Sequence, residues 1–70
     1  MEKEFIRGYN AGLDAAIAYH EQRARAADRA ASALNGIEDI DIERLRLMCI
    51  KYMMVHRAHG DALRFLRKEV

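Results

Sequence analysis

Apolar and small residues recur every three or four positions along the first half of the chain, which is the period of an α-helix. The main stripe contains Ile6, Leu13, Ile17, Ala24, Ala27, Ala31 and Leu34, with Asn10 and His20 at its two remaining positions. A second stripe beside it contains Phe5, Tyr9, Gly12, Ala16 and Tyr19. The pattern predicts a long helix over residues 2–35 that packs against two neighbours.

The second half of the chain has the same period, but its apolar residues occupy two sides of a predicted helix over residues 41–68. One side contains Ile42, Leu45, Met48, Cys49, Tyr52, Val55, His56, His59, Leu63 and Leu66. Nearly opposite lie Leu47, Ile50, Met54, Ala58 and Phe65. A hairpin of two helices can bury only one of these sides, and we predict that the first set faces residues 2–35 while the other set points away from them.

Asn35 and Gly36 indicate a turn between these helices. Glycine adopts the left-handed backbone conformation that ends a helix at no steric cost. Asp39 or Asp41 can then cap the next helix by accepting hydrogen bonds from its free amides. So short a turn, over residues 36–40, predicts that the two helices are antiparallel neighbours.

The predicted all-α hairpin, residues 1–70, is near the lower size limit for a stable single core. The hydrophobic fraction of 51% and the absence of proline argue for a folded chain. Cys49 is the only cysteine, so no disulfide within the chain can supplement the core. Because each helix carries a second apolar stripe, we expect a homodimer in which two hairpins form a four-helix bundle.

The formal net charge of +1 does not indicate a nucleic-acid-binding protein or an acidic tail. The sequence lacks the basic segment, apolar run and small-residue cleavage site of a signal peptide. Its longest apolar window, Leu47 to Val55, is interrupted by Lys51 and is too short to cross a bilayer. A lone cysteine suits a reducing compartment. We therefore expect a cytoplasmic protein with no membrane partner.

Three histidines are candidate metal ligands. His56 and His59 lie three positions apart on one side of their helix, and antiparallel pairing about the turn places His20 opposite His56. Cys49 lies about 10 Å along the helix from His56, too far to share one ion. We expect these histidines to bond to one another, to Tyr52 or to water, with no metal or other cofactor.

Cys49 near histidines also raises the possibility of nucleophilic catalysis. A catalytic nucleophile needs a pocket and a third group that orients its base. A two-helix hairpin offers little concavity, and a buried apolar thiol is normally inert. We therefore expect no catalytic residues and no enzymatic activity.

A basic flank on the second helix favours an alternative function, as a small dimeric protein that binds RNA or DNA. Its members are Arg46, Arg57, Arg64 and Lys68. Glu43 and Asp61 lie beside them at the spacing of ion pairs within a helix, which is also typical of a solvated surface. A helix-turn-helix motif is not expected, because the helices are too long and a third supporting helix is missing.

Apolar and aromatic residues outside the predicted core favour binding of another protein. The candidate partner-binding residues are Phe5, Tyr9, Tyr19, Ile50, Met54 and Phe65. Together with the expected lack of catalysis, they indicate a protein-protein interaction module.

The segment HEQRARAADRAASALNG, residues 20–36, runs from an alanine-rich helix to an Asn-Gly stop and resembles the small helical proteins of phages and prophages. In length and predicted hairpin the chain also resembles the phage quorum-sensing anti-activators, small helical homodimers that inhibit a host LuxR-type transcription regulator and a pilus assembly ATPase. Another resemblance is to plasmid copy-number RNA-binding proteins, hairpins that dimerise into four-helix bundles, although the alanine-rich seam departs from their regular core. The first resemblance implies inhibition of a host protein by docking, and assigns no role to any single residue.

Overall fold

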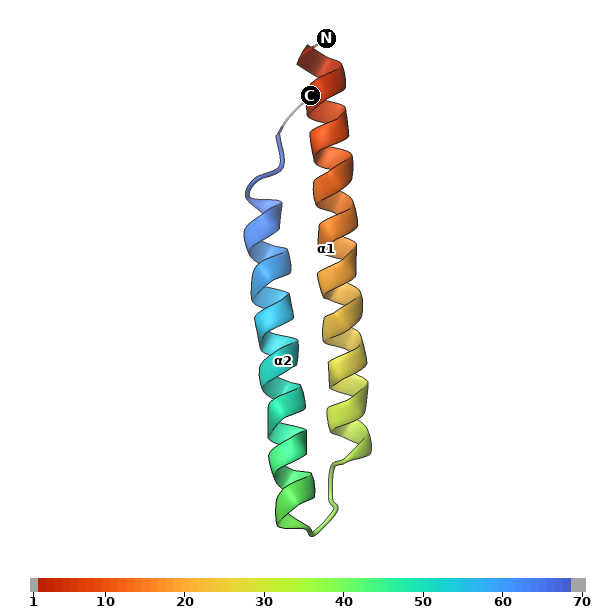
Figure 1. The fold of residues 1–70 in the computed structure, drawn as a ribbon, viewed down its shortest axis with the longest axis vertical. Helices are drawn as coiled ribbons and strands as arrows, with labels where there is room; N and C mark the ends of the chain where they lie inside the picture. The colour runs from red at the N-terminus through yellow and green to blue at the C-terminus, as the bar shows by residue number, and fades with distance from the viewer. Residues whose placement is uncertain (1, 69–70) are drawn as a thin grey trace.

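A computed structural model describes residues 2–68 and contains two helices, α1 (Glu2–Ala33) and α2 (Ile40–Arg64). The helices lie side by side and run antiparallel, with residues 2 and 68 near one end of the molecule and the turn at the other (Figure 1). The described residues outside the two helices form turns and short irregular segments. The predicted all-α antiparallel hairpin is therefore confirmed.

The hairpin is a thin rod. Its Cα atoms extend over 58 × 14 × 12 Å. The radius of gyration is 16.6 Å, whereas a compact domain of this length would have about 11 Å. Because each helix packs against only one other helix, each is exposed over most of its circumference.

The turn follows the sequence prediction closely. Gly36 has a φ of 80°, the left-handed conformation expected after the end of α1, which stops two residues before the predicted position. Of the two candidate caps, Asp39 is the one that acts, and its Oδ1 accepts hydrogen bonds from the backbone N–H groups of Asp41 and Ile42 at 2.9 and 3.1 Å. These bonds satisfy two of the amides that the first turn of a helix leaves free.

The chain leaves the helical path after Arg64, four residues before the predicted end of α2. The Phe65 N–H bonds to the carbonyls of Ala62 and Leu63, which tightens the last turn. Beyond it, the side chain of buried Asn10 pairs with the backbone of Lys68: Nδ2 donates to the Lys68 carbonyl at 2.5 Å, and Oδ1 accepts from the Lys68 N–H at 2.9 Å. Asn10 thus fastens residue 68 to the first helix.

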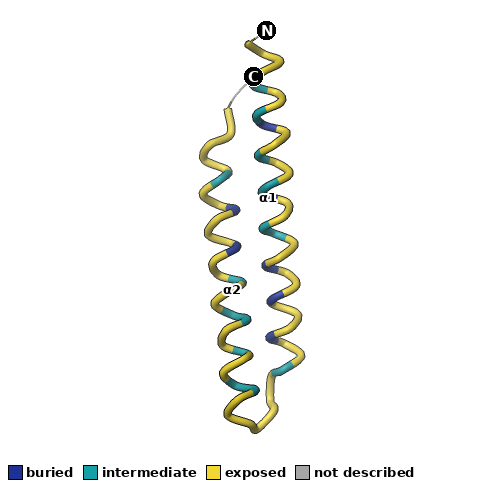
Figure 2. The backbone as a smooth tube through the Cα atoms, in the orientation of Figure 1, coloured by how far each residue is buried: buried dark blue, intermediate teal, exposed yellow. Residues whose placement is uncertain are grey.

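Alanine and glycine make up four of the seven buried residues among residues 2–68, all of them at the seam between the helices. The buried positions of α1 are Asn10, Ile17, Ala24, Ala27 and Ala31, all members of the predicted main stripe. The buried positions of α2 are His56 and Gly60. They face the opposite helix (Figure 2). Among the described residues, no large side chain falls below 2% exposure, so the core is narrow.

The predicted orientation of α2 was wrong in part. Its buried and half-buried residues are Ile42, Glu43, Arg46, Cys49, Ile50, Met53, His56, Gly60 and Leu63. Six residues predicted to face inward are instead exposed: Leu45, Met48, Tyr52, Val55, His59 and Leu66. Cys49, Met53 and His56 occupy the seam of α2 instead. Met48, Tyr52 and Val55, each one position before them, lie to one side of the seam.

Candidate functional site

The three histidines meet near the middle of the hairpin. His20 Nδ1 and His56 Nδ1 are 2.7 Å apart, a hydrogen bond in which one ring donates and the other accepts. The His59 ring stands edge-on to His20, with 5.3 Å between ring centroids. The hydrogen bond between His20 and His56 confirms their predicted pairing across the seam.

Aromatic rings and one cation surround His56. Tyr52 and Tyr19 meet it edge-on at centroid distances of 4.3 and 6.2 Å. The Arg23 guanidinium lies over the Tyr19 ring at 5.3 Å. Burial lowers the pKa of His56 below its ordinary value of 6.5, and the charges of His20, His59 and Arg23 lower it further. The folded chain therefore favours the neutral imidazole of His56 more than the unfolded chain does.

The histidine spacing is that of a hydrogen bond rather than of metal ligation. Two nitrogens bound to one tetrahedral zinc would be about 3.3 Å apart. Among residues 2–68, no group of three or more His, Cys, Asp or Glu side chains is arranged to hold a metal ion. In this arrangement His20 and His56 are joined by a hydrogen bond across the seam, and the exposed His59 ring meets them edge-on.

Large apolar side chains line one side of the seam. We call this side the open face, and it is formed by Tyr19 and Ala26 of α1 and Leu45, Met48, Tyr52 and Val55 of α2. The Met48 side chain is 66% exposed, and Tyr19 and Tyr52 are each about half exposed. Such a surface, shared by both helices, is unusual for a monomer in water.

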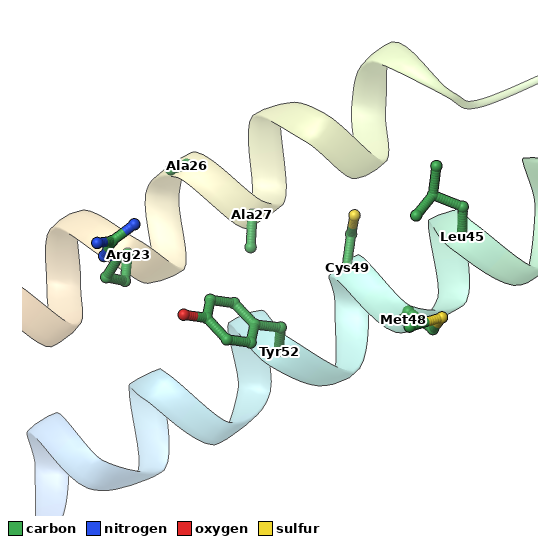
Figure 3. Close-up of a pocket in the computed structure, with 7 residues that line it drawn as sticks. All are labelled: Arg23, Ala26, Ala27, Leu45, Met48, Cys49 and Tyr52. Carbon is green, nitrogen blue, oxygen red and sulfur yellow. The ribbon is translucent and has the colours of Figure 1, made fainter.

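The open face contains a shallow apolar pocket of about 300 Å³ (Figure 3). Its α1 wall consists of the small side chains of Ala26 and Ala27 with Arg23, and its α2 wall of Leu45, Met48, Cys49 and Tyr52. A second apolar pocket, about 350 Å³, lies further along the hairpin and is lined by His20, His59, Ala62, Leu63 and Leu66. Small residues on one helix beside large ones on the other produce these hollows.

The opposite side of the seam is polar, and we call it the ion-paired face. Arg64 contacts Glu21 across the seam and Asp61 on its own helix, and Arg67 bonds to Asp14 at 3.2 Å. A pocket of about 250 Å³ on this side is lined by Asp28, Ala31, Ser32, Asn35, Arg46 and Ile50. Carboxylates of α1 therefore meet guanidinium groups from α2 and the segment after it.

Three of the four basic nucleic-acid candidates have partners within the chain. Arg46 makes a two-pronged contact with Glu43 at 2.9 and 2.6 Å, and its hydrogen bonds lower the pKa of Glu43. Arg64 contacts two carboxylates, as described above. The Lys68 ammonium lies 4.9 Å from the Tyr9 ring centroid. The fourth, Arg57, is exposed.

The six candidate partner-binding residues lie in three separate places. Phe5 and Tyr9 stack on each other at 6.3 Å beside Lys68. Tyr19 belongs to the open face. The remaining three are on α2 away from the open face: Ile50 is half-buried, whereas Met54 and Phe65 are exposed. The structure therefore does not join them into one patch.

Sequence reasoning missed the open face because it assigned the large α2 residues to the hairpin core. A signal for the correct orientation exists in the sequence. From Ile42 the seam positions advance by alternating steps of four and three: Arg46, Cys49, Met53, His56, Gly60 and Leu63. That spacing is the regular coiled-coil pattern, but an arginine and a glycine within it hide the match.

Comparisons with protein-family models, curated proteins and solved structures found no match to this chain. Over residues 2–68, neither helix is both long and apolar enough to cross a membrane. The resemblance to small phage proteins therefore stays a prediction.

Proposed function

We propose that this chain is a non-enzymatic protein-protein interaction module. It forms a homodimer, a four-helix bundle, in the cytoplasm. The bundle then docks onto another protein and alters its activity. Following the resemblance to small phage proteins, the target is a host protein, such as a transcription regulator of quorum sensing.

The observation that carries this proposal is the mismatch between a narrow core and a bulky apolar surface. Among residues 2–68, three of the four buried hydrophobic residues are alanines, whereas Met48, Met54 and Phe65 are 66%, 61% and 88% exposed. Exposed side chains of this size gain most from burial against another protein. Methionine and aromatic residues are enriched at protein-binding surfaces relative to the rest of a protein surface.

A dimer and a further partner can use different surfaces. The open face spans both helices, while Leu47 and Met54 of α2 and Phe65 at its C-cap form an outer stripe that contains no residue of α1. A single helix that presents apolar residues at this spacing can lie in a groove of another protein. The proposed dimer would present the outer stripe twice and so fit a dimeric target.

Nucleic-acid binding is the alternative that the test must separate from protein docking. The guanidinium groups of Arg46 and Arg64 already contact carboxylates of the same chain. A phosphate would have to displace Glu43, Glu21 or Asp61 to reach them. Since phosphate contacts supply most non-specific affinity for nucleic acid, this face favours that function less than the apolar surface favours docking.

The experiment immobilises the wild type and two variants, exposes each to a bacterial lysate and identifies the captured proteins by mass spectrometry. Fluorescence anisotropy with labelled RNA and duplex DNA measures nucleic-acid binding by the same three proteins. We expect Met54→Glu with Phe65→Arg to abolish capture of a specific protein, and Arg57→Glu with Arg64→Glu to leave it intact. Retrieval of nucleic acid alone, lost in the arginine variant and kept in the apolar variant, would contradict the proposal.

A further inference from the structure

The hairpin exposes more surface than a self-sufficient protein of its mass. Its accessible surface is 5543 Å², whereas a compact monomer of 8.1 kDa exposes about 4,500 Å². The excess of about 1,000 Å² is close to the roughly 800 Å² that each partner buries in a standard stable interface. The area left uncovered is therefore of the size that one partner molecule of similar scale would cover.

We propose that the open face is the surface on which a second copy of this chain sits, with the two copies related by a two-fold axis. This inference rests on the proposed function, because it names the surface through which the bundle forms. It adds that the outer stripe of Leu47, Met54 and Phe65 stays outside the dimer.

Both helices contribute to the open face, which favours a second copy as its occupant. In a four-helix bundle, each hairpin presents a layer of two helices to the other hairpin. Tyr19 and Ala26 come from α1, and Leu45, Met48 and Tyr52 come from α2. The outer stripe contains no residue of α1, so burying it would leave α1 without a partner.

The open face also carries both hollows and projections. A two-fold interface must be complementary to itself, so it needs both on one surface. The alanines Ala26 and Ala27 floor a hollow of about 300 Å³, and the exposed Met48 and Tyr52 side chains stand at its edge. Methionine adapts its shape readily, which suits insertion into the same hollow of a second copy.

The open face and the outer stripe also differ in the charged residues that they carry. Among residues 2–68, Arg23 is the only Lys, Arg, Asp or Glu that lines either apolar pocket, and it lies over the Tyr19 ring. A two-fold dimer brings like surfaces together, so a face crowded with one sign of charge would repel itself. The outer stripe, by contrast, is interrupted by charged groups that a dimer there would bury at a cost: Lys51 follows Leu47 by one turn, and Asp61 precedes Phe65 by one turn.

The test uses two methionines of nearly equal exposure on the same helix. Met48→Glu places a carboxylate on the open face, and Met54→Glu places the same charge on the outer stripe as the matched control. In analytical ultracentrifugation we expect the wild type and Met54→Glu to have an apparent mass of twice the chain mass of 8.1 kDa. We expect Met48→Glu to weaken self-association by about 30-fold or more.

A second measurement covers the case in which Met48→Glu fails to fold. In a Cys49→Ala background, a single cysteine replaces either Met48 or Met54, and its reaction rate with a thiol reagent is followed over a wide range of protein concentration. We expect Cys at 48 to become protected as concentration rises, and Cys at 54 to react at a constant rate.

The outcomes separate this inference from the proposed function. A dimer that is broken by Met54→Glu and kept by Met48→Glu overturns the open face as the interface but leaves dimerisation standing. A wild-type monomer at all concentrations, with Cys at 48 always reactive, overturns both the face and the bundle. Protection of Cys at 48 only when another protein or a lipid vesicle is added assigns the face to that occupant instead.

Discussion

The open face and the ion-paired face lie on opposite sides of the same seam, yet they are satisfied in different ways. Residues two positions apart on a helix point in nearly opposite directions, so Tyr19 and Glu21, like Met48 and Arg46, separate onto the two faces. Glu21 finds Arg64 across the seam, and Arg46 finds Glu43 on its own helix. Met48 remains two-thirds exposed.

The difference is that charged groups on one side of the hairpin have partners within the chain, whereas the apolar groups on the other side stay exposed to water. Charged groups on the ion-paired face meet their partners within one chain while staying hydrated. Apolar groups on the open face gain little until water leaves them. In the proposed dimer, the open face is therefore the side that gains free energy when the two copies associate.

The largest expected effect comes from breaking the seam that both faces share. Ala24 is 2% exposed, so Ala24→Leu forces a larger side chain between the helices and should destabilise the protein by about 1–3 kcal/mol. Urea unfolding followed by circular dichroism, at one fixed protein concentration, measures the loss. The control is Ala15→Leu at an exposed position of α1, which we expect to change stability by less than about 0.5 kcal/mol. Equal effects at the two sites would contradict a closely packed alanine seam.

Acidification should weaken the seam from within. The folded pKa of His56 lies below 6.5, so the unfolded chain binds more protons, and stability is fully present above about pH 6.5 and falls as pH decreases through the folded pKa. The groups facing His56 are His20, Tyr19 and Arg23 of α1 and Tyr52 and His59 of its own helix. Protonation of both His20 and His56 also removes the acceptor from their hydrogen bond.

The melting temperature at pH 7.5, 6.5 and 5.5 measures this dependence. His56→Gln should flatten the fall in melting temperature below neutral pH, while His59→Gln at an exposed position should keep most of it. An unchanged slope in His56→Gln would show that the acid sensitivity arises elsewhere.

A moderate effect of opposite sign is expected at a glycine of the seam. A Cβ atom on Gly60 would meet His20 Cβ at 3.7 Å, an ordinary contact. Gly60→Ala should therefore stabilise α2 by about 0.5–1 kcal/mol, because alanine loses less backbone entropy in a helix. The same change at Gly36, where φ is 80°, should destabilise by about 1–2 kcal/mol. Thermal unfolding of both variants measures this contrast. A destabilising Gly60→Ala would mean that α2 at Gly60 lies closer to His20 than the 3.7 Å contact allows.

The smallest effect should come from the ion-paired face. Arg64 is about half exposed, so Arg64→Gln, which removes its contacts with Glu21 and Asp61, should cost at most about 1 kcal/mol and nothing measurable in high salt. Arg44→Gln is the control, because Arg44 and Asp41 are 3.8 Å apart and more exposed. Chemical unfolding at low and high salt compares them. A large loss at Arg64 that persists in salt would show that this face, too, contributes to the core.

Much of the fold could be predicted from the sequence because its signals are local. The main stripe of α1, the glycine of the turn and the Asp39 cap depend on residues a few positions apart. The pairing of His20 with His56 followed from the turn alone, since a short loop fixes the register of two antiparallel helices. These features place the candidate site along the rod.

The orientation of α2 could not be predicted by counting apolar residues. Arg46 lies half-buried in the seam, where the methylene groups of an arginine can pack while its guanidinium reaches Glu43. Exposed apolar residues of α2 such as Met48 and Tyr52 lie beside the seam, each one position from a seam residue. The contact of Asn10 with Lys68 was also missed, since it forms only where the chain has left the helix.

The clasp between Asn10 and Lys68 has a mechanical consequence. Residues 2 and 68 lie near the same end of the rod (Figure 1), so a force applied to the two ends pulls the helices apart sideways instead of sliding one along the other. The two hydrogen bonds of Asn10 carry this load first, before the aromatic and histidine contacts further along. Under tension the hairpin should therefore unzip in steps, from the clasp toward the turn at Gly36.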